Sequence, residues 1–156
     1  MSDNTQTETT EIVRYTTDMI SILEDSIRSV LLIKRGKAPF KGRYALPGGH
    51  VDDGESAMDA AVQELEEETG VKVPPSWLRE VGVYDAPGRD PRGRYSTTAY
   101  VVTVPAGTQA VAADDAAAVR WVPVADLQGD LNDLAFDHGI ILSDALRLTG
   151  DRRDGI

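Results

Sequence analysis

Residues 56–70 constrain the fold most, because they predict a helix with both ends defined. Ser56 is followed three residues later by Asp59, which fits an N-terminal capping box. Gly70 stands where helices commonly end with a residue in the left-handed conformation. We therefore expect a helix over residues 56–69.

This helix carries a cluster of acids. Glu64, Glu67 and Glu68 are spaced i, i+3 and i+4, which places them on one helix face, and Glu66 adds a fourth acid nearby. Like charges at this spacing cost about 0.2–0.5 kcal/mol each, and the C-terminal turn of a helix favours cations over anions. The cluster is either a solvated acidic face or the seat of a divalent cation.

Composition limits the kind of cation. The chain has no cysteine and only two histidines, His50 and His138. This excludes a disulfide scaffold, a thiolate zinc site, an iron–sulfur cluster and a cysteine nucleophile. Hard oxygen ligands without Cys or His select Mg²⁺ or Mn²⁺.

The sequence around these acids resembles the motif of the Nudix hydrolase family. That motif reads Gly, five residues, Glu, seven residues, Arg-Glu, an aliphatic, any residue, Glu-Glu, any residue, Gly and an aliphatic. Here Gly49 and Glu55 have the first spacing, and the motif continues from Gln63 to Val71. Every defined position matches except Gln63, which replaces the arginine. This match favours the cation site over the solvated face.

The resemblance implies roles for these positions. The metal ligands would be the backbone carbonyl of Gly48 and the carboxylates of Glu64, Glu67 and Glu68. Glu55 would brace the loop by hydrogen bonds to the motif helix. The arginine normally orients the catalytic carboxylates. Gln63 can still donate hydrogen bonds but has no charge, so we expect it to affect the rate more than the fold.

The rest of the chain predicts a single α/β domain. Strands are expected at residues 15–23, 29–34, 44–46, 71–73, 78–84, 95–104 and 119–124, the last at a sheet edge because of Pro123. A second helix is expected at residues 134–148, ended by Gly150. The resemblance implies the Nudix fold, a mixed β-sheet sandwiched between helices, over residues 12–150. Residues 1–11 and 151–156 are expected to be disordered tails.

Charge limits the partners. Asp and Glu number 26 against 16 Lys and Arg, and the net charge of −10 disfavours long nucleic acid. A small anionic substrate is compatible with this charge if a cation lies between protein and phosphate. No apolar run approaches the roughly 20 residues of a membrane span, and the N-terminus lacks a signal peptide. We expect a cytoplasmic protein, with a homodimer possible through the N-terminal strand.

Substrate contacts are less strongly indicated. Arg89, Arg92 and Arg94 lie in one loop, and with Arg43 and the Phe136-Asp137-His138 sequence they resemble the branch of the family that acts on ADP-ribose. These arginines are either substrate contacts or surface residues paired with acids. Trp77, Trp121 and Tyr84 could stack on a base, although core aromatics are commoner. His138 is expected to make a structural hydrogen bond, a substrate contact remaining open, and His50 is assigned no role.

The chemistry implied by the resemblance is hydrolysis of a nucleoside diphosphate linked to another group, with metal ions screening the pyrophosphate. The general base is Glu64, Glu67 or a distal acid; no glutamate follows Glu80, so Asp114 and Asp115 are the distal candidates. Three functions remain open. They are an ADP-ribose pyrophosphatase that yields AMP and ribose 5-phosphate, a nucleoside triphosphate pyrophosphohydrolase, and a module that senses ADP-ribose without cleaving it.

Overall fold

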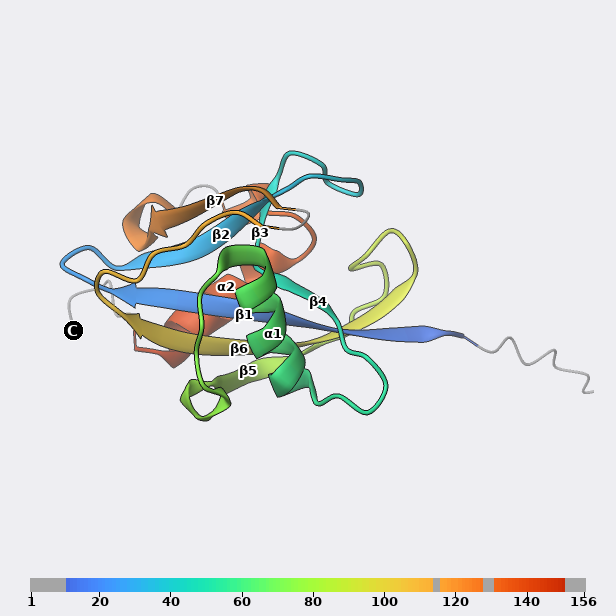
Figure 1. Cartoon of the computed structure of the whole chain (residues 1–156). Coiled ribbons are helices and arrows are strands. Elements are labelled where there is room, and N and C mark those ends of the chain that lie inside the picture. The colour runs from blue at the N-terminus through green and yellow to red at the C-terminus, as the bar shows by residue number, and fades with distance from the viewer. Residues whose placement is uncertain (1–10, 114–115, 128–130, 151–156) are drawn as a thin grey trace, which may run out of the picture.

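A computed structural model of the chain describes residues 11–113, 116–127 and 131–150 (Figure 1). The strands are β1 Val13–Glu24, β2 Ser29–Arg35, β3 Tyr44–Ala45, β4 Gly48–His50, β5 Arg79–Tyr84, β6 Arg94–Pro105 and β7 Ala116–Pro123. The α-helices are α1 Ala57–Thr69 and α2 His138–Leu148, and short 3₁₀ turns are η1 Pro75–Trp77, η2 Val124–Leu127 and η3 Leu131–Asp133. No helix in these ranges is both long and apolar enough to cross a bilayer.

The strands form one mixed sheet. Its order is β3-β2-β1-β6-β5, with β4 also paired to β1 and β7 to β2. The β1–β6 pair is parallel and the other pairs are antiparallel. Strand β7 pairs only with β2 among the described strands, so the expected edge position of Pro123 is confirmed.

The two helices cover opposite faces of the sheet (Figure 1). Side chains alternate along a strand, so neighbouring residues of β1 face different helices. Ile20 and Ile22 belong to the core cluster that contains the buried face of α2. Met19 and Leu23 belong to the cluster that contains the buried face of α1. The expected sheet between helices is therefore confirmed.

The predicted caps of α1 are present. The Ser56 hydroxyl accepts a hydrogen bond from the Asp59 N–H at 3.0 Å. Gly70 adopts the left-handed conformation with φ of 74°, and its N–H donates to the Glu66 carbonyl. These contacts fix both ends of the helix that carries the acids.

Three expected elements differ most from the structure. Residues 71–73 are not a strand; they lead into Pro74-Pro75, and Val71 and Val73 pack into the α1-side core instead. The expected strand 44–46 ends at Ala45, and Gly48–His50 forms a separate strand. Helix α2 begins at His138 rather than at 134, because Phe136 has φ of 55°, which a right-handed helix excludes.

The sheet separates at one end, and this opens a space. Strand β1 pairs with β2 only at Ile22↔Val30 and Leu23↔Ser29. Further along, β1 pairs with β4 while β2 pairs with β3. The chain between β3 and β4, Leu46 and Pro47, therefore passes where β1 and β2 have diverged, next to the N-terminus of α2 and the acidic face of α1.

Candidate active site

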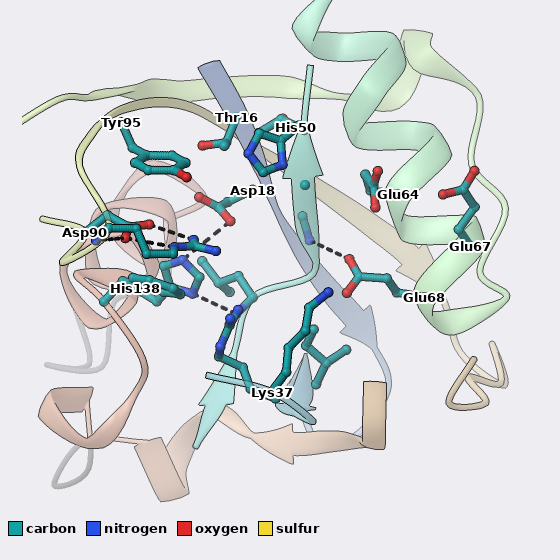
Figure 2. Close-up of a pocket in the computed structure, with 18 of the residues that line it drawn as sticks. Thr16, Asp18, Lys37, His50, Glu64, Glu67, Glu68, Asp90, Tyr95 and His138 are labelled. Atoms are coloured by element: carbon teal, nitrogen blue, oxygen red, sulfur yellow. Dashed lines mark hydrogen bonds and ion pairs between the residues drawn. The ribbon is translucent and has the colours of Figure 1, made fainter. Parts of the chain in front are cut away.

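A cavity of about 720 Å³ lies at this divergence (Figure 2). Its lining has two chemically distinct walls. The acidic wall comes from α1 and consists of Glu64, Glu67 and Glu68. The basic and aromatic wall consists of Arg35, Arg89, Arg92, Tyr95 and Phe136, with the carboxylates of Asp18 and Asp90 beside them, and Lys37 also lines the cavity. Glu64, Glu67 and Glu68 lie across the cavity from Asp90, Tyr95 and His138, as Figure 2 shows.

The acidic wall packs directly on β4. The Gly48 N–H donates to Glu68 Oε1 at 2.8 Å. A Cβ on Gly49 would lie 2.5 Å from Glu64 Cδ, so only glycine allows the carboxylate to sit there. Gln63 Nε2 donates to Glu67 Oε1 at 2.8 Å. Hydrogen bonds thus orient Glu67 and Glu68, and Glu64 lies against Gly49.

The backbone of Gly48 also points into the cavity. Gly48 is opposite Asp18 in the antiparallel β1–β4 pair, while Met19 N–H bonds the Pro47 carbonyl and Val51 N–H bonds the Tyr15 carbonyl. Antiparallel pairs alternate between bonded and non-bonded positions, and a residue directs its N–H and C=O to the same side. Gly48 occupies a non-bonded position, so its carbonyl points away from β1, to the side where its N–H meets Glu68.

Burial and neighbouring carboxylates both affect the protonation of Glu68 at this wall. Burial is the main cause that raises the pKa of Glu68 to about 8. The hydrogen bond from Gly48 opposes the shift, and the charges of Glu64 and Asp18 reinforce it. Within the described part of the chain, no three Asp, Glu or His side chains already converge as a metal cage. The donor set itself, three carboxylates and a backbone carbonyl, fits a hard divalent cation.

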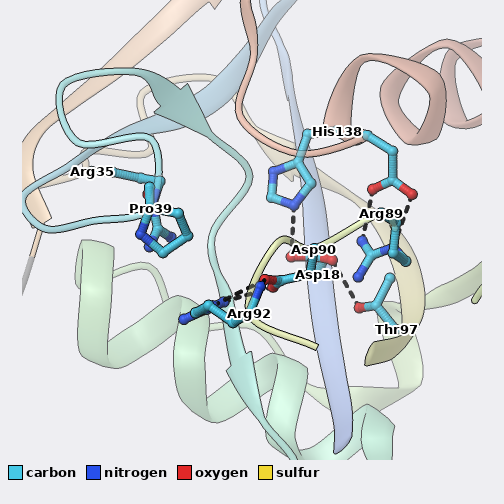
Figure 3. A network of polar contacts seen from close by, with 9 residues as sticks. Asp18, Arg35, Pro39, Arg89, Asp90, Arg92, Thr97 and His138 are labelled. Atoms are coloured by element: carbon cyan, nitrogen blue, oxygen red, sulfur yellow. Dashed lines mark hydrogen bonds and ion pairs between the residues drawn. The ribbon is translucent and has the colours of Figure 1, made fainter. Parts of the chain in front are cut away.

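The opposite wall holds its arginines in fixed positions. Arg92 forms two bonds to Asp90, at 3.0 and 2.7 Å, and its guanidinium carbon lies 5.0 Å from the Tyr95 ring centroid and 5.6 Å from that of Phe136. Arg89 is nearly buried and bonds Asp137 twice, at 2.9 and 2.7 Å (Figure 3). Both arginines are therefore preorganised.

Arg35 completes this wall. Its Nε donates to the Pro39 carbonyl at 2.6 Å, and its guanidinium carbon lies 4.9 Å from the Phe136 ring centroid. Burial, and next the nearby guanidinium of Arg92, lower the pKa of Arg35. The guanidiniums of Arg35 and Arg92 both approach the Phe136 ring, and their charges repel each other. A bound anion such as a phosphate would reduce this repulsion.

Comparison with known proteins shows which family the chain belongs to. The family model described as "NUDIX domain" matches residues 14–144. The chain belongs to the Nudix family.

Three relatives are similar to the chain. An ADP-ribose pyrophosphatase of Methanocaldococcus jannaschii is 42% identical over 76% of this chain and 66% of its own length. The ADPR responsive transcriptional repressor NtrR of Acinetobacter baylyi is 34% identical over 74% of this chain and 46% of its own length. The NUDIX domain of Shewanella oneidensis NrtR, solved with ADP ribose, has a TM-score of 0.79 at 27% identity and covers 94% of both chains. The chain thus spans just under two thirds of the first curated relative and less than half of the second.

The proposed metal ligands Gly48, Glu64, Glu67 and Glu68 line the cavity together, whereas Glu55 and Gln63 of the same motif do not line it. Glu55 bonds the loop rather than the helix, because its Oε1 accepts from Asp52 N–H at 3.0 Å. Arg43 and Arg94 do not line the cavity, and Arg43 lies over the ring of Phe40 instead. Asp114 and Asp115 lie outside the described residues.

The aromatic residues that line the cavity also differ from those expected. Trp77 is half exposed on η1, Trp121 packs against the α1-side core, and the Tyr84 hydroxyl donates to Asp144. Tyr95 and Phe136 line the cavity in their place. The sequence marked Phe136 only through its place in the Phe136-Asp137-His138 sequence, and it did not mark Tyr95, which lies near the start of β6.

Four more lining residues were missed or left without a role. Arg35 ends β2 and Lys37 lies in the basic loop that follows, and this charge was the available signal. His50 lines the cavity, 5.9 Å from the Tyr95 ring centroid. Asp18 is buried in β1 and gave no sequence signal. The hydrogen bond expected of His138 is present, because its Nδ1 accepts from the Leu46 N–H.

Proposed function

We propose that this Nudix protein hydrolyses the pyrophosphate of ADP-ribose to AMP and ribose 5-phosphate, with Mg²⁺ or Mn²⁺ as cofactor. The observation that carries the proposal is the pairing of a carboxylate wall with a guanidinium wall across one cavity. A diphosphate with divalent cations complements both walls. The archaeal pyrophosphatase and the ADP-ribose-bound NrtR domain support this substrate.

The cation would be held by the carbonyl of Gly48 and by Glu64, Glu67 and Glu68. A divalent cation supplies charge neutralisation for the pyrophosphate and a lower pKa for the attacking water. Gln63 keeps Glu67 in position through its 2.8 Å hydrogen bond, the task that the motif arginine has in the family. Glu55 holds the motif loop through Asp52.

On the other wall, Arg35 and Arg92 would bind the phosphate oxygens, because both guanidiniums line the cavity beside Phe136. Arg89 also lines it, with its guanidinium held by Asp137, and so presents a fixed positive edge. Fixed donors lose little freedom on binding, which favours affinity for a small anion. Arg43 and Arg94 do not line the cavity, so a substrate contact of either remains a prediction from the sequence.

The proton from water would go to Glu64 or Glu67, which line the cavity, or to Asp114 or Asp115 as predicted from sequence. Turnover of Glu67→Gln, Asp114→Asn and Asp115→Asn separates these options. Full activity in both asparagine variants removes the distal base.

Product analysis with Mg²⁺ tests the reaction. ADP-ribose should give AMP and ribose 5-phosphate, and Glu64→Gln should lower kcat by at least about 100-fold, as expected for a group of the catalytic set. Glu66→Gln is the matched control, because Glu66 lies on the same helix but outside the cavity lining, paired with Lys72 at 3.5 Å. Faster release of free pyrophosphate from nucleoside triphosphates would contradict the proposal and favour a nucleoside triphosphate pyrophosphohydrolase.

A sensing module is the second candidate, because one relative is an ADPR responsive transcriptional repressor. Tight ADP-ribose binding without turnover in saturating Mg²⁺ would establish it over the enzyme. We also propose a cytoplasmic location and a homodimer, and sedimentation analysis tests the homodimer.

A further inference from the structure

A buried histidine joins α2 to the segment that precedes β4. His138 is 4% exposed and is the first residue of α2. Its Nδ1 accepts the Leu46 N–H at 3.0 Å, and its Nε2 lies 3.4 Å from Asp18 Oδ1 (Figure 3). The histidine thus bridges two segments that are far from it in sequence.

The neighbours of His138 determine which of its ring nitrogens carries the proton. Because the Leu46 N–H donates to Nδ1, the ring proton lies on Nε2 and faces Asp18. The other Asp18 oxygen accepts from the Thr97 hydroxyl at 2.8 Å. Burial lowers the pKa of His138, which keeps the ring neutral and able to accept. Thr97, Asp18 and His138 therefore orient one another, and the last of them holds Leu46.

The segment held in this way contains Gly48. The Pro47 carbonyl accepts the Met19 N–H at 2.8 Å, and the Gly48 N–H donates to Glu68 at 2.8 Å. A Cβ on Gly48 would lie 2.6 Å from Asp18 Oδ1, so Asp18 also packs against this residue. Three consecutive residues, beginning at Leu46, each have a polar backbone group fixed from outside the segment.

We infer that His138 is a positioning residue that sets the direction of the Gly48 carbonyl and thereby the affinity for a divalent cation. Rotation of the 46–48 segment would turn that carbonyl away from Glu68, and the Leu46 N–H is the contact that resists rotation at the start of the segment. The inference rests on the proposed cation site but on no particular substrate.

Mn²⁺ binding to the full chain without nucleotide tests the inference, with free Mn²⁺ measured by electron paramagnetic resonance. His138→Leu removes the acceptor and should weaken Mn²⁺ binding about tenfold, the lower end of the effect of residues that orient metal ligands. His138→Asn retains an acceptor at the δ position and should stay within about threefold of wild type. His138→Gln places its acceptor one bond further out and should resemble His138→Leu.

A control separates positioning from loss of packing. Ile141 lies one turn along α2, is fully buried and does not line the cavity. Ile141→Val destabilises the same helix without touching the Leu46 contact, so its Mn²⁺ affinity should equal that of wild type. Thermal melts show whether each variant is folded at the assay temperature.

Wild-type affinity in folded His138→Leu would overturn the inference and leave the proposed function intact. If His138→Leu does not fold, equal affinities in His138→Asn and His138→Gln overturn it in the same way. A weaker affinity in Ile141→Val, equal to that of the His138 variants, would also overturn it. Absence of Mn²⁺ binding to wild type would instead remove the proposed cation site, and the inference with it.

Discussion

Gly49→Ala should abolish the site while it leaves the fold intact. A Cβ at this position would lie 2.5 Å from Glu64 Cδ and 2.7 and 2.8 Å from its two oxygens. Ordinary contacts between such atoms are about 3.5–4.0 Å, so the overlap is about 1 Å. The clashing atoms are the end of a flexible side chain, and Glu64 relieves the clash by rotating out of the acidic wall.

The substitution should affect stability much less than activity. A side chain forced away from its preferred rotamer costs about 0.5–1.5 kcal/mol, which for a domain of this length lowers Tm by only a few degrees. Loss of even an indirect contact to a metal ligand costs about 10- to 100-fold in affinity or activity. Because Glu64 is itself a proposed ligand, we expect kcat/KM to fall by at least about 100-fold.

The assay compares ADP-ribose hydrolysis in Mg²⁺ with thermal melts of the same preparations. Gly82→Ala is the matched control, because a Cβ there would meet nothing closer than Tyr84 at 3.6 Å. It should match wild type in both measurements. Activity within about threefold of wild type in Gly49→Ala would refute the reasoning, and so would a loss of activity that only follows unfolding.

Three further outcomes are expected. Gly48→Ala should unfold the protein rather than inactivate a folded one in circular dichroism melts, because its Cβ would lie 2.1 Å from the backbone oxygen of Thr17, which cannot rotate away. Gln63→Arg should keep or raise kcat with ADP-ribose, since Gln63 already donates to Glu67 and a charged donor strengthens that bond; a large loss would show another task. The raised pKa of Glu68, about 8 when folded against an ordinary 4.5, means that the folded metal-free protein binds the extra proton. Tm in chelator should therefore fall as pH rises from about 5 to 8, and Glu68→Gln should flatten that fall.

The sequence predicted the features that depend on residues close together in the chain. The caps at Ser56 and Gly70 and the spacing of the acids depend on residues a few positions apart, and α1 has the expected ends. The fold class and the family also followed, because the motif is one continuous segment.

The second wall could not be predicted in the same way. Arg35 and Arg92 meet at Phe136 only because β2, the loop before β6 and the segment before α2 converge in the tertiary structure. Asp18 and His138 are more than a hundred residues apart in sequence and became neighbours through the packing of α2 on β1. Strand β4 was missed because its pairing with β1 spans a long loop, and Gly48-Gly49 has low strand propensity.

The acids of α1 violate local helix energetics, and the surrounding structure explains how the helix tolerates them. The last turn has no basic residue, so the cluster gains nothing from the helix dipole. The helix is instead held by its two caps and by Ala60, Ala61 and Leu65 in the core, which is independent of the charged face. A few tenths of a kcal/mol per like-charge pair is small against that burial, about 1.5–3 kcal/mol for a leucine alone. The scaffold can therefore keep carboxylates close together without a cation, ready to bind one. Burial is the main cause of the raised pKa of Glu68, and the nearby charge of Glu64 reinforces it.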